Sequence, residues 1–206
     1  IFMAMLSGSL SGFCTAFLQT TLGIESILAG IIVNTGLYTI NLAVMGFSSN
    51  LSIFGTNTVF TLFAGENPFL SEWGTLILLL LILLLVAFIL RWFFGTGLGL
   101  SIRATGDSPA MVRASSINPA FTITVGLCLS NALTGLSGAL IAQYNKASDI
   151  NLGNGMVTVA LASLVIGETL FGKRKLLGRI LGVIGGAILY RLVIALALRL
   201  RVPTEA

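Results

Sequence analysis

The sequence predicts an all-α integral membrane protein, with residues 1–206 forming a single membrane domain. Hydrophobic residues make up 56% of the chain and charged residues 9%, whereas a soluble domain carries roughly 25% charged residues. The apolar residues form about six runs near the length that a helix needs to cross a bilayer. The regular alternation of membrane β-strands is absent, so the spans are predicted to be helices.

The first predicted span covers residues 2–19. Gly8 and Gly12 stand one helical turn apart on it, a spacing that lets two membrane helices approach closely. A tight turn at residues 20–23 leads to the second span. We therefore expect the first span to pack tightly against another helix.

The second predicted span, residues 24–45, carries a polar stripe. Asn34, Tyr38 and Asn41 lie at i, i+4 and i+7 and therefore share one helix face. Polar groups in lipid are costly, so this face should turn toward the bundle or a wet cavity. Two interpretations stay open: hydrogen bonds between helices, or the wall of a solute path.

A polar stretch over residues 46–72 follows, and part of it, residues 52–63, is expected to be a short surface helix or a re-entrant piece. The third span, residues 73–94, is framed by Trp73 and Trp92, which suit the two membrane interfaces. It is apolar on all sides, so we expect it to face lipid at the periphery.

Residues 97–119, GLGLSIRATGDSPAMVRASSINP, are predicted to form a hairpin of two short helices between two spans. The first helix is expected over residues 98–105, with Gly106 in the left-handed conformation just after it. Ser108 suits the cap of the second helix, and Pro109 suits its first position, where no N–H is needed.

The second short helix is expected to end near Ser116, and Asn118 and Pro119 then repeat the cap-and-proline signal. These two residues start the fourth span, residues 120–143. A rigid helical hairpin held at a membrane face suggests docking to a soluble partner.

The fourth span carries Asn131 and Thr134 beside small residues, which favours close helix packing, a path wall, or both. The last two spans are predicted over residues 155–172 and 176–198. The final span has a stripe of glycines at four-residue spacing, which are Gly178, Gly182 and Gly186.

Alternation of six spans places most basic residues on one side, which the positive-inside rule assigns to the cytoplasm. These residues are Arg91, Arg103, Arg113, Lys173, Arg174, Lys175 and Arg179. Residues 97–119 and 173–175 are thus predicted to be cytoplasmic. Both chain ends fall on the other side, and the chain starts inside an apolar run without Met. We therefore expect a fragment, with flanking helices missing at both ends.

Residues that could carry covalent chemistry are few. The chain has no His, two Cys and seven acidic residues, so no catalytic, cofactor-binding or metal-ligating residue is predicted. The phosphate-cradling GxxxxGK[ST] motif is also absent, so this chain is not expected to bind ATP.

The segment LSIRATGDSPAMVRASSINP resembles the cytoplasmic coupling segment of permease subunits in ABC importers of the branched-chain amino acid and ribose type. That family typically shows R-A-x-G-x-x-x-x-x-A-x-x-x-G-I-N here. The chain departs at Val112, which is bulkier than the usual Ala on a docking face, and at Ser116, where Gly would close the helix better. The matching residues are Arg103, Ala104, Gly106, Ile117 and Asn118.

The resemblance extends over nearly the whole chain. It includes ILAGIIVNTGLYTINLAVMG, LSNALTGLSGALIAQYNKASDINLGNGM and GETLFGKRKLLGRILGVIGGAILYRLVIALALRL. The second segment looks like the family's next span and external loop. The first and third look closest to a branch that pairs with a substrate-binding lipoprotein and is assigned to amino acids, aromatic ones among them.

The resemblance implies a type II importer-like permease of the bacterial inner membrane that works as a dimer, without an active site of its own. The hairpin would insert into a cytoplasmic ATPase subunit, which binds ATP and Mg, and an external lipoprotein would deliver the solute. The residues expected to contact the ATPase are Arg103, Ala104, Gly106, Asp107, Met111, Arg113 and Ala114. The residues expected along the solute path are Asn34, Tyr38, Asn41, Asn131 and Thr134.

Simpler interpretations compete with these roles. Arg103 and Arg113 could serve membrane orientation alone, and Asp107 could be only a turn residue. The alternative function is an ion-coupled secondary transporter, which needs membrane-buried carboxylates and an inverted repeat. Glu168 is the one carboxylate that suits this role, and no convincing repeat is visible.

Overall fold

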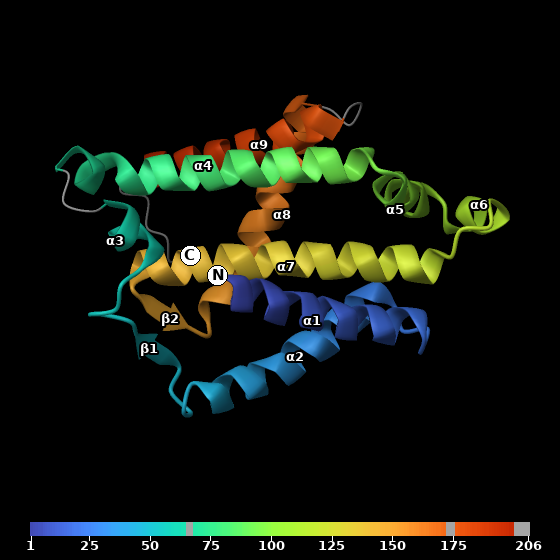
Figure 1. The fold of residues 1–206 in the computed structure, drawn as a ribbon, viewed down its shortest axis with the longest axis horizontal. Helices are drawn as coiled ribbons and strands as arrows, with labels where there is room; N and C mark the ends of the chain where they lie inside the picture. Colours follow the sequence, from blue (N-terminus) through green and yellow to red (C-terminus); the bar gives the residue numbers. More distant parts are fainter. Residues whose placement is uncertain (65–67, 172–175, 200–206) are drawn as a thin grey trace. The chain divides into compact units, whose positions relative to one another are not determined.

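The computed structural model describes residues 1–64, 68–171 and 176–199, and the chain divides into two compact units, Ile1–Ile150 and Asn151–Ala206 (Figure 1). The second unit contains α8 (Leu152–Phe171) and α9 (Leu176–Arg199). The first unit contains α1 (Phe2–Thr20), α2 (Ser26–Val44), β1 (Asn50–Ser52), α3 (Val59–Ala64), α4 (Pro68–Gly95), α5 (Gly97–Asp107), α6 (Pro109–Ala114), α7 (Pro119–Asn145) and β2 (Ala147–Asp149).

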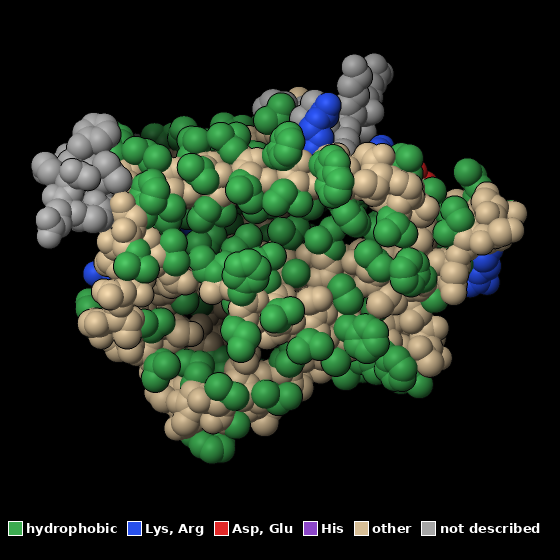
Figure 2. Space-filling view, in the orientation of Figure 1, with side chains coloured by type: hydrophobic (Ala, Val, Ile, Leu, Met, Phe, Trp, Pro, Cys, Tyr) green, Lys and Arg blue, Asp and Glu red, His purple; other side chains and the backbone are tan. Residues whose placement is uncertain are grey.

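Within the described residues, five helices are long and apolar enough to cross a membrane, namely α1, α2, α4, α7 and α9. Helix α8 carries a shorter apolar stretch, Met156–Leu170, so a sixth span there stays a prediction. Large apolar side chains lie on the outside, and Leu76, Leu84 and Phe88 of α4 are each more than 60% exposed. Figure 2 shows hydrophobic side chains across the visible face. The predicted all-α membrane fold is confirmed.

The first unit is built around the contact of α1 with α7, where glycines bring two backbones together. A Cβ added at Gly12 would lie 2.5 Å from the Leu127 carbonyl oxygen and 2.9 Å from the Cys128 Cα. A Cβ at Gly8 would collide with the Asn131 carbonyl oxygen. The close approach predicted from Gly8 and Gly12 is therefore confirmed.

The second unit repeats this kind of packing between α8 and α9. A Cβ at Gly186 would lie 2.7 Å from the Gly167 nitrogen and would collide with the Ser163 carbonyl oxygen. A Cβ at Gly167 would in turn collide with the Gly182 carbonyl oxygen. Two glycines of the predicted stripe, Gly182 and Gly186, thus form the helix contact.

The segment between α2 and α4 has more structure than the sequence predicted. Strand β1 pairs with β2 in antiparallel fashion, with Asn50 opposite Asp149. This pairing was not predicted because strands of three residues are too short to show an alternating pattern. The short helix expected within residues 52–63 is α3, which begins at Val59, and α4 begins at Pro68, before its predicted start at residue 73.

Candidate functional site

The hairpin formed by α5 and α6 begins at a tight corner after α4. The Thr96 hydroxyl accepts a hydrogen bond from the Gly99 N–H at 3.3 Å and donates to the Phe93 carbonyl at 2.6 Å. A Cβ at Gly99 would lie 2.5 Å from the Phe94 Cα, so the corner requires glycine. The prediction started this helix at residue 98 and missed the Thr96 cap, although a threonine directly before a glycine-rich first turn is a recognisable signal.

The turn between α5 and α6 is made differently from the prediction. Gly106 lies inside α5, which continues to Asp107, so its expected left-handed position was wrong. The helix ends because Ser108 is extended, at φ −159° and ψ 102°, as a residue before proline prefers. The Ser108 hydroxyl then accepts from the Met111 N–H at 3.4 Å, with Pro109 at the first position, which confirms the predicted cap.

Helix α6 closes with a left-handed residue at Ser116, whose φ is 60°. The Ile117 N–H donates to the Val112 carbonyl at 3.2 Å, and the Ser116 N–H donates to the Arg113 carbonyl at 3.1 Å. These two bonds are the Schellman arrangement, which usually holds glycine at its left-handed position. The helix itself ends at Ala114, before the predicted end near residue 116.

The inner side of the hairpin is buried against α7. Val112 is 2% exposed, so its expected place on a docking face was wrong, and its extra methyl groups fill the interior. Thr105 and Thr122 are also buried, and their hydroxyl oxygens lie 2.8 Å apart. The Asn118 side-chain oxygen accepts from the Ala120 N–H at 3.0 Å, which confirms the predicted cap of α7.

The outer side of the hairpin carries the residues expected to contact a partner. Figure 1 shows α6 beyond the ends of α4 and α7, with α5 leading to it from α4, and Figure 2 shows basic side chains at this end. Ala104 is half-buried. The exposed residues are Arg103, Gly106, Asp107, Met111, Arg113 and Ala114. Both signs of charge are thus available to a polar partner, and a role in coupling stays a prediction.

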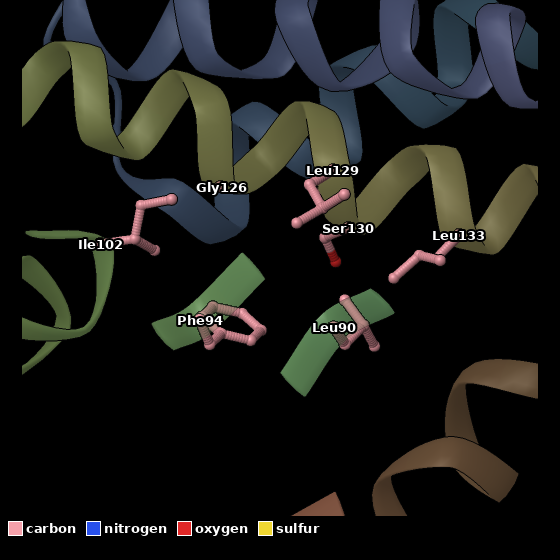
Figure 3. Close-up of a pocket in the computed structure, with 7 residues that line it drawn as sticks. All are labelled: Leu90, Phe94, Ile102, Gly126, Leu129, Ser130 and Leu133. Atoms are coloured by element: carbon pink, nitrogen blue, oxygen red, sulfur yellow. The ribbon is translucent and has the colours of Figure 1, made fainter. Parts of the chain in front are cut away.

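A cavity of about 190 Å³ lies between α4, α5 and α7, where the hairpin joins the two long helices (Figure 3). Apolar side chains point into it, and the Ser130 hydroxyl is the one polar group on its lining side chains. This cavity was not predicted, because it forms only where three separate helices pack together. The lining residues are Leu90, Phe94, Ile102, Gly126, Leu129, Ser130 and Leu133.

The polar stripe of α2 lies on the surface of the first unit. Asn34, Tyr38 and Asn41 are all exposed, and Ala29 is the buried residue of this helix. Helix α2 packs against α1, so one face of α2 is covered and the stripe is open. The structure leaves the stripe free to contact solute or another helix, and its place on a solute path stays a prediction.

The two residues of α7 that were predicted along the solute path form hydrogen bonds within their own helix. The Asn131 side-chain nitrogen donates to the Leu127 carbonyl at 3.0 Å, and the Thr134 hydroxyl donates to the Ser130 carbonyl at 3.1 Å. Helix α1 packs against both α2 and α7. Helix α1 therefore lies in contact with both helices that carry the predicted path residues, α2 and α7. A shared role of these residues in a solute path stays a prediction.

Other predicted residues add little to the site. Residues 173–175 lie outside the described residues. Glu168 lies on α8 and is not without an interaction partner. In the described ranges, no three His, Cys, Asp or Glu side chains lie close enough to hold a metal ion.

Comparisons with known proteins identify the family. Residues 1–204 match the model of the branched-chain amino acid transport system / permease component. A tyrosine transport system permease protein of Clostridioides difficile (strain R20291) is 34% identical over 198 residues, which are 96% of this chain and 64% of that protein. The galactose/methyl galactoside import permease protein MglC of Escherichia coli (strain K12) is 26% identical over 186 residues, 90% of this chain and 54% of that protein.

A third relative is the D-allose transport system permease protein AlsC of Escherichia coli (strain K12), which is 36% identical over 108 residues, 52% of this chain and 32% of that protein. The chain thus spans less than two thirds of the length of these relatives. No solved structure matches it. The match over residues 1–204, together with a helical membrane fold and its exposed hairpin, shows that the chain belongs to the branched-chain amino acid transport permease family.

Proposed function

We propose that this chain is part of the membrane-spanning permease subunit of an ATP-driven importer, which moves a small polar solute inward by alternating access. The observation that carries the proposal is the hairpin of α5 and α6. Its caps and buried residues make it rigid, while Arg103, Asp107 and Arg113 remain exposed. A rigid, charged projection at the end of a membrane bundle suits docking to a soluble subunit.

We propose an amino acid as the solute. The support is the match to a protein named as a tyrosine transport system permease, which is 34% identical over 96% of this chain. The permease named for galactose is 26% identical over 90% of this chain, and the permease named for D-allose is 36% identical over only 52% of it. Uptake of labelled tyrosine into cells that express the complete permease tests this. Competition by unlabelled tyrosine but not by galactose is expected. Absence of tyrosine uptake, with uptake of labelled galactose by the same cells, would replace the amino acid with a sugar.

We propose that the permease lies in the inner membrane of a bacterium and has three partners. A cytoplasmic subunit binds ATP and Mg and hydrolyses the ATP, a substrate-binding lipoprotein delivers the solute, and a second copy of the permease completes the path. Family membership supports these partners. The permease itself supplies binding surfaces and movement, and the chemistry of hydrolysis belongs to the ATP-binding subunit.

Co-purification tests the proposal. The complete, tagged permease is purified from its native host, and the associated ATPase activity is measured. The native hairpin should retain an ATPase subunit, and the double variant Arg103→Glu/Arg113→Glu should lose it, because both exposed cations would become anions. Arg91→Glu reverses the charge of an exposed residue on α4 and is the control.

Two results would contradict the proposal. Equal loss of ATPase activity from Arg91→Glu would show a general effect of charge rather than a docking site. Absence of any ATPase from the native protein, with solute uptake driven by an ion gradient alone, would favour a secondary transporter.

A further inference from the structure

We propose that the buried hydroxyl pair of Thr105 and Thr122 is the joint that passes movement of the hairpin into α7. This inference rests on the proposed function and deepens it, because it assigns positioning residues to the coupling step. The two threonines lie on different helices, α5 and α7, and neither belongs to the exposed docking side.

The geometry of the pair supports a specific joint. Thr105 is 6% exposed and Thr122 is 2% exposed, and their hydroxyl oxygens lie 2.8 Å apart. Each hydroxyl also lies within reach of a carbonyl of its own helix, Ser101 at 2.7 Å and Pro119 at 2.9 Å. A hydroxyl has one hydrogen, so one threonine donates across the helices while the other donates to the carbonyl of its own helix. Separating the helices would break the buried bond between the two threonines.

The hydroxyl pair differs from the apolar contact beside it. A Cβ at Gly126 would lie 3.4 Å from the Ile102 Cγ2. Helices α5 and α7 therefore also meet through an apolar contact, and both of these residues line the cavity. Apolar contacts are non-directional and allow small sliding movements. A hydrogen bond depends on direction as well as distance, so the pair fixes the register of α5 on α7.

Movement of α7 could pass to α1 and from there to α2, because these helices pack in that order. Gly8 and Gly12 of α1 touch the α7 backbone at Asn131 and Leu127, with no side chains between them. Helix α1 also packs against α2, which carries the polar stripe with Tyr38. The proposed joint therefore connects the docking hairpin to the polar faces through two close helix contacts.

Coupling measurements test the joint. The complete permease and its ATPase subunit are reconstituted in vesicles, and solute uptake per ATP hydrolysed is compared among variants. Thr105→Val and Thr122→Val keep the shape and remove one hydroxyl. Each should lower the ratio by about 2- to 30-fold, the range expected when coupling between sites is disturbed. The double variant should be no worse than either single one, because both changes remove the same interaction.

Two controls separate the joint from general stability. Thr124→Val removes a hydroxyl on the same helix that donates to the Ala120 carbonyl at 2.8 Å, and it should leave the ratio unchanged. Thr105→Ser retains the hydroxyl and should preserve the ratio. If the valine variants do not accumulate in the membrane, Thr105→Ala and Thr122→Ala are read in the same way.

The outcomes distinguish this inference from the proposed function. An unchanged ratio in the threonine variants, or the same fall in Thr124→Val, would overturn the joint while ATP-driven uptake by the native protein stands. Additive effects of the two single changes would also overturn it. A native complex that retains no ATPase would instead contradict the proposed function itself.

Discussion

The two ends of α7 are held in different ways. At its beginning, Asn118 caps the helix and Thr122 bonds to Thr105 of the adjacent hairpin, a partner 17 residues away. At its end, the Gln143 side-chain oxygen accepts from the Val59 N–H at 3.0 Å, a partner 84 residues away. Local contacts thus hold the hairpin end, and distant contacts hold the other.

The far end gathers several long-range contacts. The Phe60 and Tyr144 rings pack edge to face with centroids 6.2 Å apart, and Asn50 of β1 pairs with Asp149 of β2. These contacts tie the segment between α2 and α4 to α7. The hairpin end lacks such ties in the described residues and leaves its outer side exposed. One end of α7 can therefore present a docking surface, while the other restrains a long connection.

The largest expected effect is a loss of stability from a charge placed at a buried position of the hairpin. Val112→Asp places a charge at a site that is 2% exposed, and it should lower the free energy of unfolding by about 3–5 kcal/mol, the cost of an uncompensated buried charge. Met111→Asp is the matched control at a neighbouring site that is 66% exposed, where a change within about 0.5 kcal/mol is expected. Thermal unfolding of the purified permease in detergent measures both, and equal losses would show that Val112 does not anchor the hairpin.

A smaller effect is expected at the far end. Gln143→Leu removes the acceptor of the Val59 N–H and should cost about 1–3 kcal/mol, because that donor loses its partner. The loss should appear as faster proteolytic cleavage within residues 46–58, with little change at the hairpin. Gln143→Glu keeps a side-chain oxygen and is the control. Cleavage at the native rate in Gln143→Leu would mean that this bond does not restrain the connection.

The same difference explains what the sequence could predict. The caps at Ser108 and Asn118 were confirmed, because a cap depends on residues within three positions. The turn at Gly106 was predicted wrongly because the residue before Pro109 ended the helix without a left-handed glycine. The Gln143 contact and the β1–β2 pairing could not be predicted, since neither segment alone indicates its distant partner.

In the candidate site, too, features set by neighbouring residues could be predicted and features set by distant packing could not. The exposed side of the hairpin could be anticipated from residues within one short segment, Arg103 and Arg113 among them. The inward side of Val112 could not, because its burial depends on how α6 packs on α7. The Thr105–Thr122 pair required the same information, as both residues look like ordinary helix threonines in the sequence.

The smallest expected effect is a gain in stability at the hairpin end, from a substitution at the end of α6. Ser116→Gly should raise the free energy of unfolding by about 0.5–1 kcal/mol, because the left-handed conformation at φ 60° strains serine and not glycine. Ser115→Gly is the matched control, since Ser115 has φ −87° and ψ 17°. There glycine relieves no strain and should cost about 0.5–1 kcal/mol through its greater freedom in the unfolded chain. Ser115→Gly also removes the hydroxyl that donates to the Met111 carbonyl at 3.2 Å, which adds to its loss. A higher unfolding temperature for Ser116→Gly and a lower one for Ser115→Gly would show that the left-handed conformation at Ser116 is strained, whereas equal shifts would contradict it.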